Sequence, residues 1–484
     1  MTTATPKTTA TPKTTATPKT ARAATAAVSS TPGADTVVAD LRAVYATRRT
    51  RPLAWRLAQL DGLERLLAEE EPAIAEAMAA DLGRNAYDTW FGEIVGTKAE
   101  IDVARKNLKR WVRPQRQSLP LTQLPGSARV EFEPLGTVLI IGPWNYPVFL
   151  TLSPLVAAIA AGNTVVIKPS ELAPKTSAFL ARALPRYVDA EAVRVVEGDG
   201  ATTQDLLAQG FDHALFTGGT EIGKKIMESA AKTLTPVTLE LGGKSPVVIL
   251  SDADLEIAAR RILWVKLLNS GQTCIAPDYI LVENSVKPAF IDALRKVLIE
   301  LRAGEPDLQR IVNERQFSRI AGYLDSTSGS IVTGGRTDAA SISIEPTIID
   351  EPSPTDPVMT DEIFGPVLPV LGIENAEAAV TFVNSRPKPL AFYVFTRSKA
   401  TADQLISDVP SGGAVVNHVA MHCLIPSLPF GGVGASGIGA YHGRWGFETF
   451  SHRKAVLVKT QKPDLKFQYP PYSEFAKKLL RRIL

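Results

Sequence analysis

The chain has 484 residues, enough for about three domains, and its apolar fraction of 45% is ample for sizeable cores. Two cysteines exclude a disulfide framework and fit a reducing compartment. The net charge of +3 comes from four basic residues in the first 34 positions. The rest of the chain is therefore close to neutral and lacks the basic footprint of a nucleic-acid-binding protein. No apolar run approaches the roughly 18 residues that a membrane span needs.

Residues 1–33 form a low-complexity segment, in which Thr-Thr-Ala-Thr-Pro-Lys occurs three times between positions 2 and 19. Proline at every sixth position blocks helix formation, and almost nothing in the segment can be buried. We therefore expect a disordered tail. Because it is acid-poor and threonine-rich, an organelle transit peptide stays open as an alternative, and no secretory signal is expected.

The next segment, residues 35–113, has leucines and alanines at three- and four-residue spacing, which predicts helices. Uninterrupted apolar runs then predict buried strands at 137–141, 164–168, 193–196 and 214–217. Helical patterns at 153–161 and 176–190 separate them. Strands that alternate with helices in this way favour a doubly wound parallel sheet.

A second α/β block follows residue 240. Its predicted strands are 246–250, 279–282 and 391–395, and its predicted helices are 255–268 and 287–301. At the end of the chain, Phe475, Leu479 and Ile483 recur at four-residue spacing among basic residues. This pattern predicts a short amphipathic helix that docks on the protein or on a dimer partner, with association at a membrane surface as the alternative.

Cys274 follows a Gly-Gln-Thr lead-in, which lets backbone amides approach a sulfur and leaves one face of it open. A thiolate in such a place attacks carbonyl groups, although a single cysteine is more often a small buried side chain. The five histidines form no convincing metal set. His418 and His422, four positions apart, have no carboxylate pattern nearby, so we expect no metal.

Three polar residues follow strands or glycine-rich turns and suit carbonyl chemistry. Asn145 lies on a proline-bracketed loop after the strand at 137–141, where its amide can stabilise an oxyanion. Glu240 precedes two glycines and can act as a general base. Glu362, on an Ile-Phe-Gly-Pro turn, offers a second carboxylate.

A glycine turn at residues 216–224 joins a predicted strand to a helix and suits a pyrophosphate, with Gly218, Thr220 and Gly223 at its key positions. Its middle position departs from the common dinucleotide fingerprint. Lys168 and Glu171, just past another predicted strand, can bind ribose or phosphate, or can form an ordinary solvated ion pair.

Together these motifs resemble the aldehyde dehydrogenase superfamily, in family order and from about residue 36 onward. Glu240 lies 34 positions before Cys274, a spacing like that of the family. The sequence around Cys274, at 427–434 with 441–443, at 447–452 and at 469–472 is similar to the class 3 branch. Members of that branch oxidise aromatic and medium- to long-chain aliphatic aldehydes.

The resemblance implies an α/β fold with a doubly wound parallel-sheet dinucleotide-binding domain, a second α/β catalytic domain and a small β oligomerisation arm. The implied boundaries are 34–113 with 135–239 for the NAD(P)-binding domain and 240–438 for the catalytic domain. Residues 114–134 with 439–484 are the arm and the C-terminal tail. The arm strands imply a homodimer, and we expect a cytoplasmic location without nucleic-acid partners.

By the same resemblance, Cys274 forms a thiohemiacetal and then a thioester, with the oxyanion held by Asn145 and the Cys274 backbone N–H. Glu240 activates the hydrolytic water, and Glu362 shares this role or binds the nicotinamide ribose. The resemblance also implies roles for the remaining site residues: Lys168 and Glu171 hold the adenosine ribose, Phe364 packs near the nicotinamide, and Trp144, Tyr146, His422 and Cys423 are candidates to contact the aldehyde.

The cofactor is NAD, NADP or both, because Glu171 favours a 2′-hydroxyl while class 3 relatives with this glutamate often use NADP. A coenzyme A-acylating dehydrogenase is the main alternative, and it usually lacks a glutamate at the position of Glu240. A thiol hydrolase and a non-catalytic binding protein on the same fold are further alternatives. The hydrolase would need a histidine partner for Cys274, and the binding protein would not need Cys274, Asn145 and Glu240 together.

Overall fold

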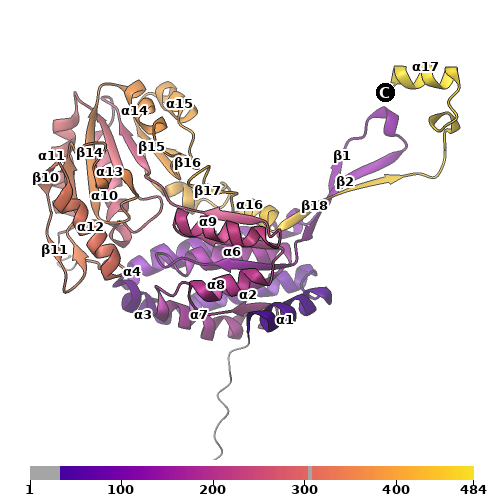
Figure 1. Ribbon diagram of the computed structural model, residues 1–484, viewed down its shortest axis with the longest axis horizontal. Coiled ribbons are helices and arrows are strands. Elements are labelled where there is room, and N and C mark those ends of the chain that lie inside the picture. Colours follow the sequence, from indigo (N-terminus) through magenta and orange to yellow (C-terminus); the bar gives the residue numbers. More distant parts are fainter. Residues whose placement is uncertain (1–32, 304–307, 484) are drawn as a thin grey trace, which may run out of the picture. The chain divides into compact units, whose positions relative to one another are not determined.

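The computed structural model describes residues 33–303 and 308–483. The predicted disordered tail lies outside them, except for Gly33. From Ala34 on, the chain forms two large sheets with their helices and a separate three-stranded sheet (Figure 1).

The helices predicted in residues 35–113 are present. They are α1 (Ala34–Ala46), α2 (Leu53–Glu69), α3 (Glu71–Leu82), α4 (Ala86–Thr89) and α5 (Gly96–Trp111). Gly83, with a left-handed φ of 66°, ends α3. Between α4 and α5 lies a π-helical turn, η1 (Trp90–Val95), which the apolar periodicity does not predict.

The first large sheet has six strands in the order β17-β7-β6-β3-β4-β5, all parallel except β17. The strands are β3 (Thr137–Ile141), β4 (Thr164–Lys168), β5 (Val193–Val195), β6 (His213–Thr217), β7 (Val237–Glu240) and β17 (Gly437–Ile438). The helices between them are α6 (Phe149–Ala161), α7 (Pro174–Tyr187), α8 (Gly200–Ala208) and α9 (Thr220–Ala231). The predicted doubly wound sheet is confirmed, and β7 is a strand that the pattern did not predict.

The order of these strands reverses between β3 and β6. From β3 the chain winds outward through β4 and β5, and from β6 it winds outward through β7 on the other side. In doubly wound sheets, ligands bind beyond the carboxyl ends of the strands at such a reversal. The loops that follow β3 and β6 therefore flank the expected ligand crevice.

The second large sheet has seven strands in the order β10-β13-β14-β9-β8-β15-β16, and only β10 is antiparallel. The strands are β8 (Pro246–Ile249), β9 (Tyr279–Glu283), β10 (Ser330–Thr333), β13 (Thr347–Asp350), β14 (Val367–Ile373), β15 (Ala391–Phe395) and β16 (Gly413–Val416). Its helices are α10 (Leu255–Leu267), η3 (Leu268–Gly271), α11 (Lys287–Leu301), α12 (Glu314–Ser326), α13 (Pro357–Thr360), α14 (Ala376–Asn384), α15 (Lys399–Asp408) and η4 (Met421–Leu424). The strands β11 (Thr337–Asp338) and β12 (Ser343–Ile344) form a small ribbon beside it.

The third sheet joins β1 (Gln115–Gln117) and β2 (Gly126–Pro134) to β18 (Ser451–Lys459), all antiparallel. The short helices α16 (Gly443–Thr449), η2 (Leu121–Gln123) and η5 (Lys466–Gln468) flank these strands in sequence. The predicted amphipathic helix is α17 (Glu474–Ile483). Within the described residues, no helix is both long and apolar enough to span a bilayer.

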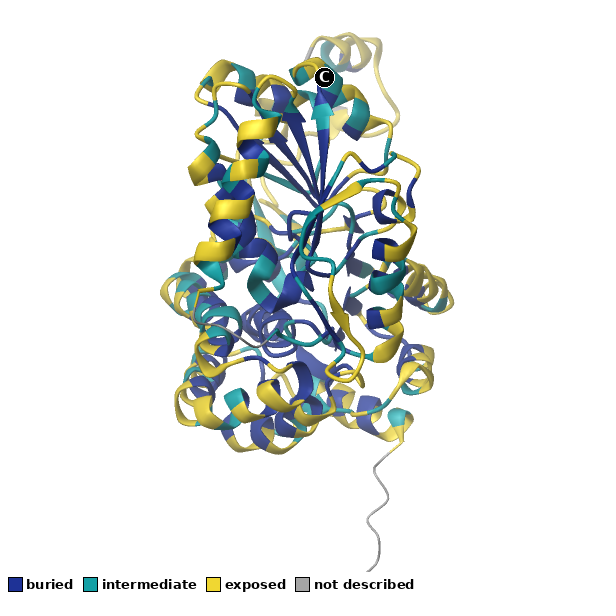
Figure 2. Ribbon diagram, turned by 90° about the vertical axis from the view of Figure 1, so that its left-hand side faces the viewer, coloured by how far each residue is buried: buried dark blue, intermediate teal, exposed yellow. Residues whose placement is uncertain are grey.

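One apolar core runs through both large sheets, because residues of β3 and β8 belong to the same buried cluster. Helix α6 is buried along all of its 13 residues and packs on α2, α5, α16 and the strands β3 and β4. Figure 2 shows most strands of the two large sheets buried while the outer faces of the helices are exposed. The loops at the strand ends therefore rest on a rigid support.

Candidate active site

Four of the predicted site residues lie at one edge of the six-stranded sheet. Asn145 is in the loop after β3, Lys168 ends β4, Gly218 follows β6 and Glu240 ends β7. The four strands are parallel neighbours, so their carboxyl ends share this edge. All four residues line one cavity of about 980 Å³, near the upper end of roughly 300–1,000 Å³ for ligand sites.

Cys274 reaches the same cavity from the loop between η3 and β9. Asn269, Ser270 and Gly271 before it have left-handed φ values of 51°, 54° and 72°. Such a conformation costs about 1–3 kcal/mol at each non-glycine position. At Gly271 a side chain is also excluded, because a Cβ atom would lie 2.2 Å from the carbonyl oxygen of Gly365. The lead-in is therefore a strained turn that packs directly on another loop.

Buried amide side chains hold this turn in place. Gln272 Nε2 donates to the Asn269 carbonyl at 3.0 Å, and Gln272 Oε1 accepts from the Val312 N–H at 2.9 Å. Gln309 Nε2 donates to Asn269 Oδ1 at 2.7 Å. Gln272 thus bonds the backbone of the turn and Gln309 bonds the side chain of Asn269, and both contacts favour the strained conformation.

The Asn145 side chain is buried and points to the cysteine loop. Its Nδ2 donates to the Gln272 carbonyl at 3.0 Å, and the Asn145 carbonyl accepts from Asn269 Nδ2 at 2.9 Å. An amide nitrogen has two N–H groups, so one stays available to an oxygen in the cavity. This geometry fits the predicted oxyanion donor.

The two predicted carboxylates meet at the glycine pair after β7. Glu362 accepts from the Gly243 N–H, and a Cβ atom on Gly242 would lie 2.0 Å from Glu362 Oε2. Burial, aided by Asp278, raises the pKa of Glu362 to about 8. Burial also raises the pKa of Glu240 well above its ordinary value, and neither of its carboxylate oxygens has a partner among the described residues. Both carboxyls thus line the cavity with raised pKa values.

The Cys274 thiol is also affected by its surroundings. Burial raises its pKa above the ordinary value, and the nearby Glu362, Cys423 and Glu240 raise it further. The thiol is therefore protonated at neutral pH in the chain without bound molecules.

The start of α9 opens into the large cavity. Gly219 caps the helix with extended backbone and has open space where a Cβ atom would be, while the Gly218 N–H donates to the Glu240 carbonyl at 3.0 Å. A Cβ atom on Gly223 would lie 2.6 Å from the Leu241 side chain, so glycine allows close packing there. Thr220 Oγ1 donates weakly to the Ala435 carbonyl at 3.4 Å. A bare helix start of this kind suits a phosphate.

Lys168 and Glu171 form an ion pair of 2.7 Å at the cavity wall. The lysine side chain is 3% exposed and the glutamate 46% exposed, so the pair has one buried end and one end in solvent. Together with the start of α9, these residues fit a dinucleotide, whose ribose and phosphate groups need both acceptors and donors.

Two aromatic rings close the cavity near the glutamates. Trp144 and Phe364 lie edge to face with ring centroids 5.4 Å apart, and Phe364 has a left-handed φ of 50°. Trp144, a predicted aldehyde contact, therefore lines the dinucleotide-sized cavity beside Phe364.

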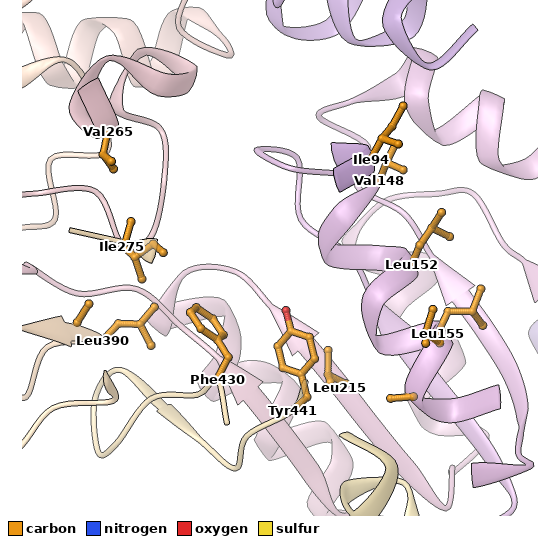
Figure 3. Packing of buried hydrophobic residues seen from close by; sticks show 14 of the residues in the cluster. Ile94, Val148, Leu152, Leu155, Leu215, Val265, Ile275, Leu390, Phe430 and Tyr441 are labelled. Carbon is orange, nitrogen blue, oxygen red and sulfur yellow. The ribbon is translucent and has the colours of Figure 1, made fainter. Parts of the chain in front are cut away.

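A second, narrow cavity of about 80 Å³ reaches Cys274 from the other side. Cys274 and three further residues line both cavities: Leu150, Phe430 and Tyr441. Figure 3 shows the rings of Phe430 and Tyr441 in the apolar cluster with Ile275 and Leu390. The two cavities thus adjoin at these four residues, Cys274 among them.

The narrow cavity is lined by mostly apolar side chains, among them Tyr146 and Cys423. Tyr146 hydroxyl is 2.9 Å from Thr273 Oγ1, directly before the cysteine. His422 is not among the residues that line either cavity in the described chain; its ring lies 5.8 Å from that of Phe430. Of the four predicted aldehyde contacts, the structure brings Tyr146 and Cys423 to this cavity.

Several residues around the site were not predicted. Tyr441 and His442 line the narrow cavity, and the Tyr441 hydroxyl has no partner among the described residues. Their Tyr-His-Gly signal was visible in the sequence as part of a family match, but nothing there assigned a role. Arg84 and Glu93 are close to the Asn145 loop, and only the structure connects them to it.

The fold and the site define a class of enzyme: a dinucleotide-dependent oxidoreductase with a cysteine that lines both a large and a narrow cavity. Comparisons agree with this class. The sequence matches the aldehyde dehydrogenase family over residues 5–456. Aldehyde dehydrogenase family 3 member A2 of Rattus norvegicus is 46% identical over 440 residues, which cover 90% of each chain.

Two further matches extend the comparison. Aldehyde dehydrogenase, dimeric NADP-preferring, of Rattus norvegicus is 43% identical, covering 89% of this chain and 96% of the relative. The solved structure of a substrate-bound state of Staphylococcus aureus AldH has a TM-score of 0.89 at 40% identity, covering 93% and 99%. The chain belongs to the aldehyde dehydrogenase family, and it oxidises aldehydes with NAD or NADP.

The raised pKa of Cys274 leads to a testable pH dependence. Alkylation needs the thiolate, so iodoacetamide should inactivate the enzyme without added cofactor slowly at pH 7, and the rate should still rise above about pH 8.5, the ordinary thiol value. Residual activity after timed exposure gives the rates. The Cys423→Ala variant, which lacks the other thiol, should show the same profile. A plateau below pH 8.5 would contradict the raised pKa.

Proposed function

We propose that the enzyme oxidises medium- to long-chain aliphatic or aromatic aldehydes to carboxylic acids through a covalent adduct on Cys274. The supporting observation is that Cys274 lines both the dinucleotide-sized cavity and the narrow apolar one. An aldehyde carbon bonded to this sulfur keeps its hydrocarbon chain in the apolar cavity and its reacting face toward the large cavity.

The first step is addition of the Cys274 sulfur to the aldehyde carbon. Because burial raises the pKa of the thiol, its proton passes to a water molecule in the large cavity as the new bond forms. The carbonyl oxygen becomes an oxyanion, which accepts hydrogen bonds from the free N–H of Asn145 and from the Cys274 backbone N–H. Holding the reactants in line can supply about 7–11 kcal/mol of the acceleration.

NAD or NADP, when bound, supplies the hydride acceptor for this reaction. The chain's own contribution is to hold it at the strand ends: Lys168 and Glu171 suit the adenosine ribose, and the turn of Gly218, Thr220 and Gly223 suits the pyrophosphate. Glu171 favours NAD by accepting from a 2′-hydroxyl. Its exposed end leaves room for NADP as well.

The thioester left on Cys274 is hydrolysed by water that Glu240 activates. The raised pKa of Glu240 makes it a stronger base than an ordinary carboxylate once it is deprotonated. Glu362, with its pKa of about 8, shares this role or binds the nicotinamide ribose, while Phe364 packs beside the nicotinamide.

The site gives less support to the alternatives. A cysteine hydrolase needs a histidine bonded to the thiol, yet the ring nitrogens of His442, which lines the narrow cavity, have no hydrogen-bond partner among the described residues. Burial also lowers the pKa of His442 to about 3, so it stays neutral. A coenzyme A-acylating enzyme has no need of Glu240 as a base.

Two variants test the mechanism. Cys274→Ala should lower turnover of hexanal or benzaldehyde by about 1,000-fold or more, measured as NAD(P)H absorbance, because the nucleophile is lost.

Glu240→Gln should lower steady-state turnover by about 100- to 10,000-fold. It should still release one NAD(P)H per active site in a burst, because only hydrolysis is blocked.

Undiminished turnover by Cys274→Ala would refute the nucleophile. A wild-type reaction that requires coenzyme A would instead support the acylating alternative. Running each assay with NAD and with NADP shows which cofactor the enzyme accepts.

The apolar lining predicts a dependence on chain length. Each buried methylene is worth about 0.8 kcal/mol, so kcat/KM should rise roughly fourfold per methylene through a series of linear aldehydes until the cavity is full. Cys423→Phe should narrow the cavity and flatten the series, while the matched Cys423→Ala should not. A flat series in the wild-type enzyme would refute an apolar substrate site.

We also propose the domain division of 34–113 with 135–239 for cofactor binding and 240–438 for catalysis, and a homodimer formed through the arm. The dimer is supported by exposed Leu121, Leu124, Leu457 and Val458 on the arm, since apolar surface of this extent favours burial against a partner. Two unpaired cysteines fit a cytoplasmic location.

Sedimentation tests the dimer. The wild-type enzyme should sediment as a dimer at micromolar concentration. The double variant Leu457→Lys with Val458→Lys places a charge on both faces of β18 and should sediment as a monomer, because either face would then bury a charge in the interface. The control Ile331→Lys alters an exposed apolar residue of β10 and should stay dimeric. A monomeric wild-type enzyme would exclude the proposal.

A further inference from the structure

A buried ion pair lies beside the loop that holds Asn145. Arg84 follows α3, and Glu93 is in the π-helical turn η1. Arg84 Nη1 is 2.6 Å from Glu93 Oε1, and the side chains are only 1% and 0% exposed. A buried pair loses much solvation and is often no more stable than apolar side chains of the same size, so stability alone does not account for it.

Two further polar atoms of the pair bind the Asn145 loop and the start of α6. Arg84 Nη2 donates to the Asn145 carbonyl at 2.7 Å, and its guanidinium lies 4.5 Å from the centre of the Tyr146 ring. Glu93 Oε2 accepts from the N–H groups of Val148 at 3.0 Å and Phe149 at 2.8 Å. The pair therefore holds the chain from the Asn145 carbonyl to the N–H groups of Val148 and Phe149.

The same contacts start helix α6. Its N-cap residue, Val148, provides no side-chain cap, so Glu93 fills that role from a distant part of the chain. Figure 3 shows Ile94 and Val148 together in the apolar cluster, next to these bonds. Because α6 is buried along its whole length, the loop is fixed between a rigid helix and the ion pair.

The π-helical turn has a feature that suits this task. Gly92, directly before Glu93, has no side chain, and a Cβ atom there would lie 3.0 Å from the Tyr146 ring and 3.4 Å from Arg84 Nη1. The turn thus passes close to the loop without crowding it. Turns of this kind are rare in helices and occur frequently at functional sites.

On its other side, the loop is bonded to the cysteine turn. Asn145 Nδ2 donates to the Gln272 carbonyl, Asn269 Nδ2 donates to the Asn145 carbonyl, and Tyr146 bonds Thr273. The Asn145 carbonyl therefore accepts from both Arg84 and Asn269. A shift at the ion pair would displace the Asn145 amide relative to the Cys274 sulfur.

We propose that the Arg84–Glu93 pair is a positioning element for the oxidation: it holds the Asn145 amide where the oxyanion forms on Cys274. Glu93 acts through Asn145 and Tyr146 and is not a catalytic residue. Arg84 acts in the same way but also lines the narrow cavity, so its variant is read together with Glu93→Gln. The inference rests on the proposed function of Asn145 as the oxyanion donor. It adds the residues that place this donor.

Rapid-mixing kinetics test the proposal. Glu93→Gln keeps the volume but loses the charge, and Arg84→Lys keeps the charge but replaces the two separate nitrogens that bond Glu93 and Asn145 with a single one. We expect both to slow the NAD(P)H burst by about 10- to 100-fold per titrated active site, because small misplacements near a reaction centre have effects of this size. Cofactor affinity should stay unchanged. If addition to the aldehyde becomes slower than hydride transfer, the isotope effect on the burst with a deuterated aldehyde should become smaller than in the wild-type enzyme.

A purely structural role predicts a different result. The melting temperature would fall while the burst rate per folded active site stayed at the wild-type value, and this outcome would overturn the proposal. The control Asp356→Asn alters another buried carboxylate, which accepts from the Ser328 N–H at 2.7 Å and lines neither cavity. It should lower the melting temperature without changing the burst rate.

Two further variants keep the test decisive. Gly92→Ala retains both charges and crowds Tyr146, so it should fold and still slow the burst if Glu93→Gln does not fold. Because Gly92 also lines the narrow cavity, the burst is compared at saturating aldehyde. In an Asn145→Ala background, Glu93→Gln should cause little further slowing, because no amide remains to be placed. Full additivity of the two effects would refute the inference.

The outcomes also separate the two proposals. A normal burst in Asn145→Ala would refute the oxyanion role, and the positioning role with it. A slow burst in Asn145→Ala together with a normal burst in Glu93→Gln, Arg84→Lys and Gly92→Ala would refute the positioning role alone.

Discussion

Partial desolvation of the ionisable groups around Cys274 governs the chemistry of this enzyme, with Cys274 and Glu362 half-buried and Glu240 buried. Burial is the largest cause of the raised pKa values of Cys274, Glu240 and Glu362. Such groups react strongly once ionised, but each ionisation is costly in the resting site. The protein therefore depends on hydrogen bonds that are already in place when charge develops, and these come from the strand-end loops.

The sheets explain how distant motifs reach one point. Asn145, Lys168 and Glu240 are far apart in the sequence, yet each lies at or just after the end of a parallel strand. Parallel connection brings these ends to one edge, and the reversal between β3 and β6 opens the crevice there. Cys274 comes from the second α/β unit, so the reaction centre needs both large sheets.

Much of this could be predicted from local patterns. The strand at 137–141 is confirmed residue for residue, because a strand buried on both faces is an unbroken apolar run. The strand β7 was missed because only four residues, Val237–Glu240, form it and a polar residue ends it. The π-helical turn was missed because its residues keep an ordinary helical composition.

In the candidate site too, local sequence patterns predicted some residues and missed others. Cys274, Asn145 and Glu240 occur in short motifs whose residue types suit the chemistry. The bond between Arg84 and Asn145 joins positions 61 residues apart and has no local pattern. The sequence also could not show that His422 lies against Phe430 while the next residue, Cys423, lines the narrow cavity. Such differences depend on side-chain packing between elements.

The contact between Gly271 and Gly365 has a consequence for engineering. The turn before the nucleophile and the turn after Phe364 touch backbone to backbone, with no space for even one methyl group between them. Neither turn can change its shape unless the other changes too. Transplanting the cysteine loop of a relative into this chain would therefore require the matching Glu362–Pro366 segment from the same donor. The two loops must therefore be exchanged together, although 94 positions separate the two glycines along the chain.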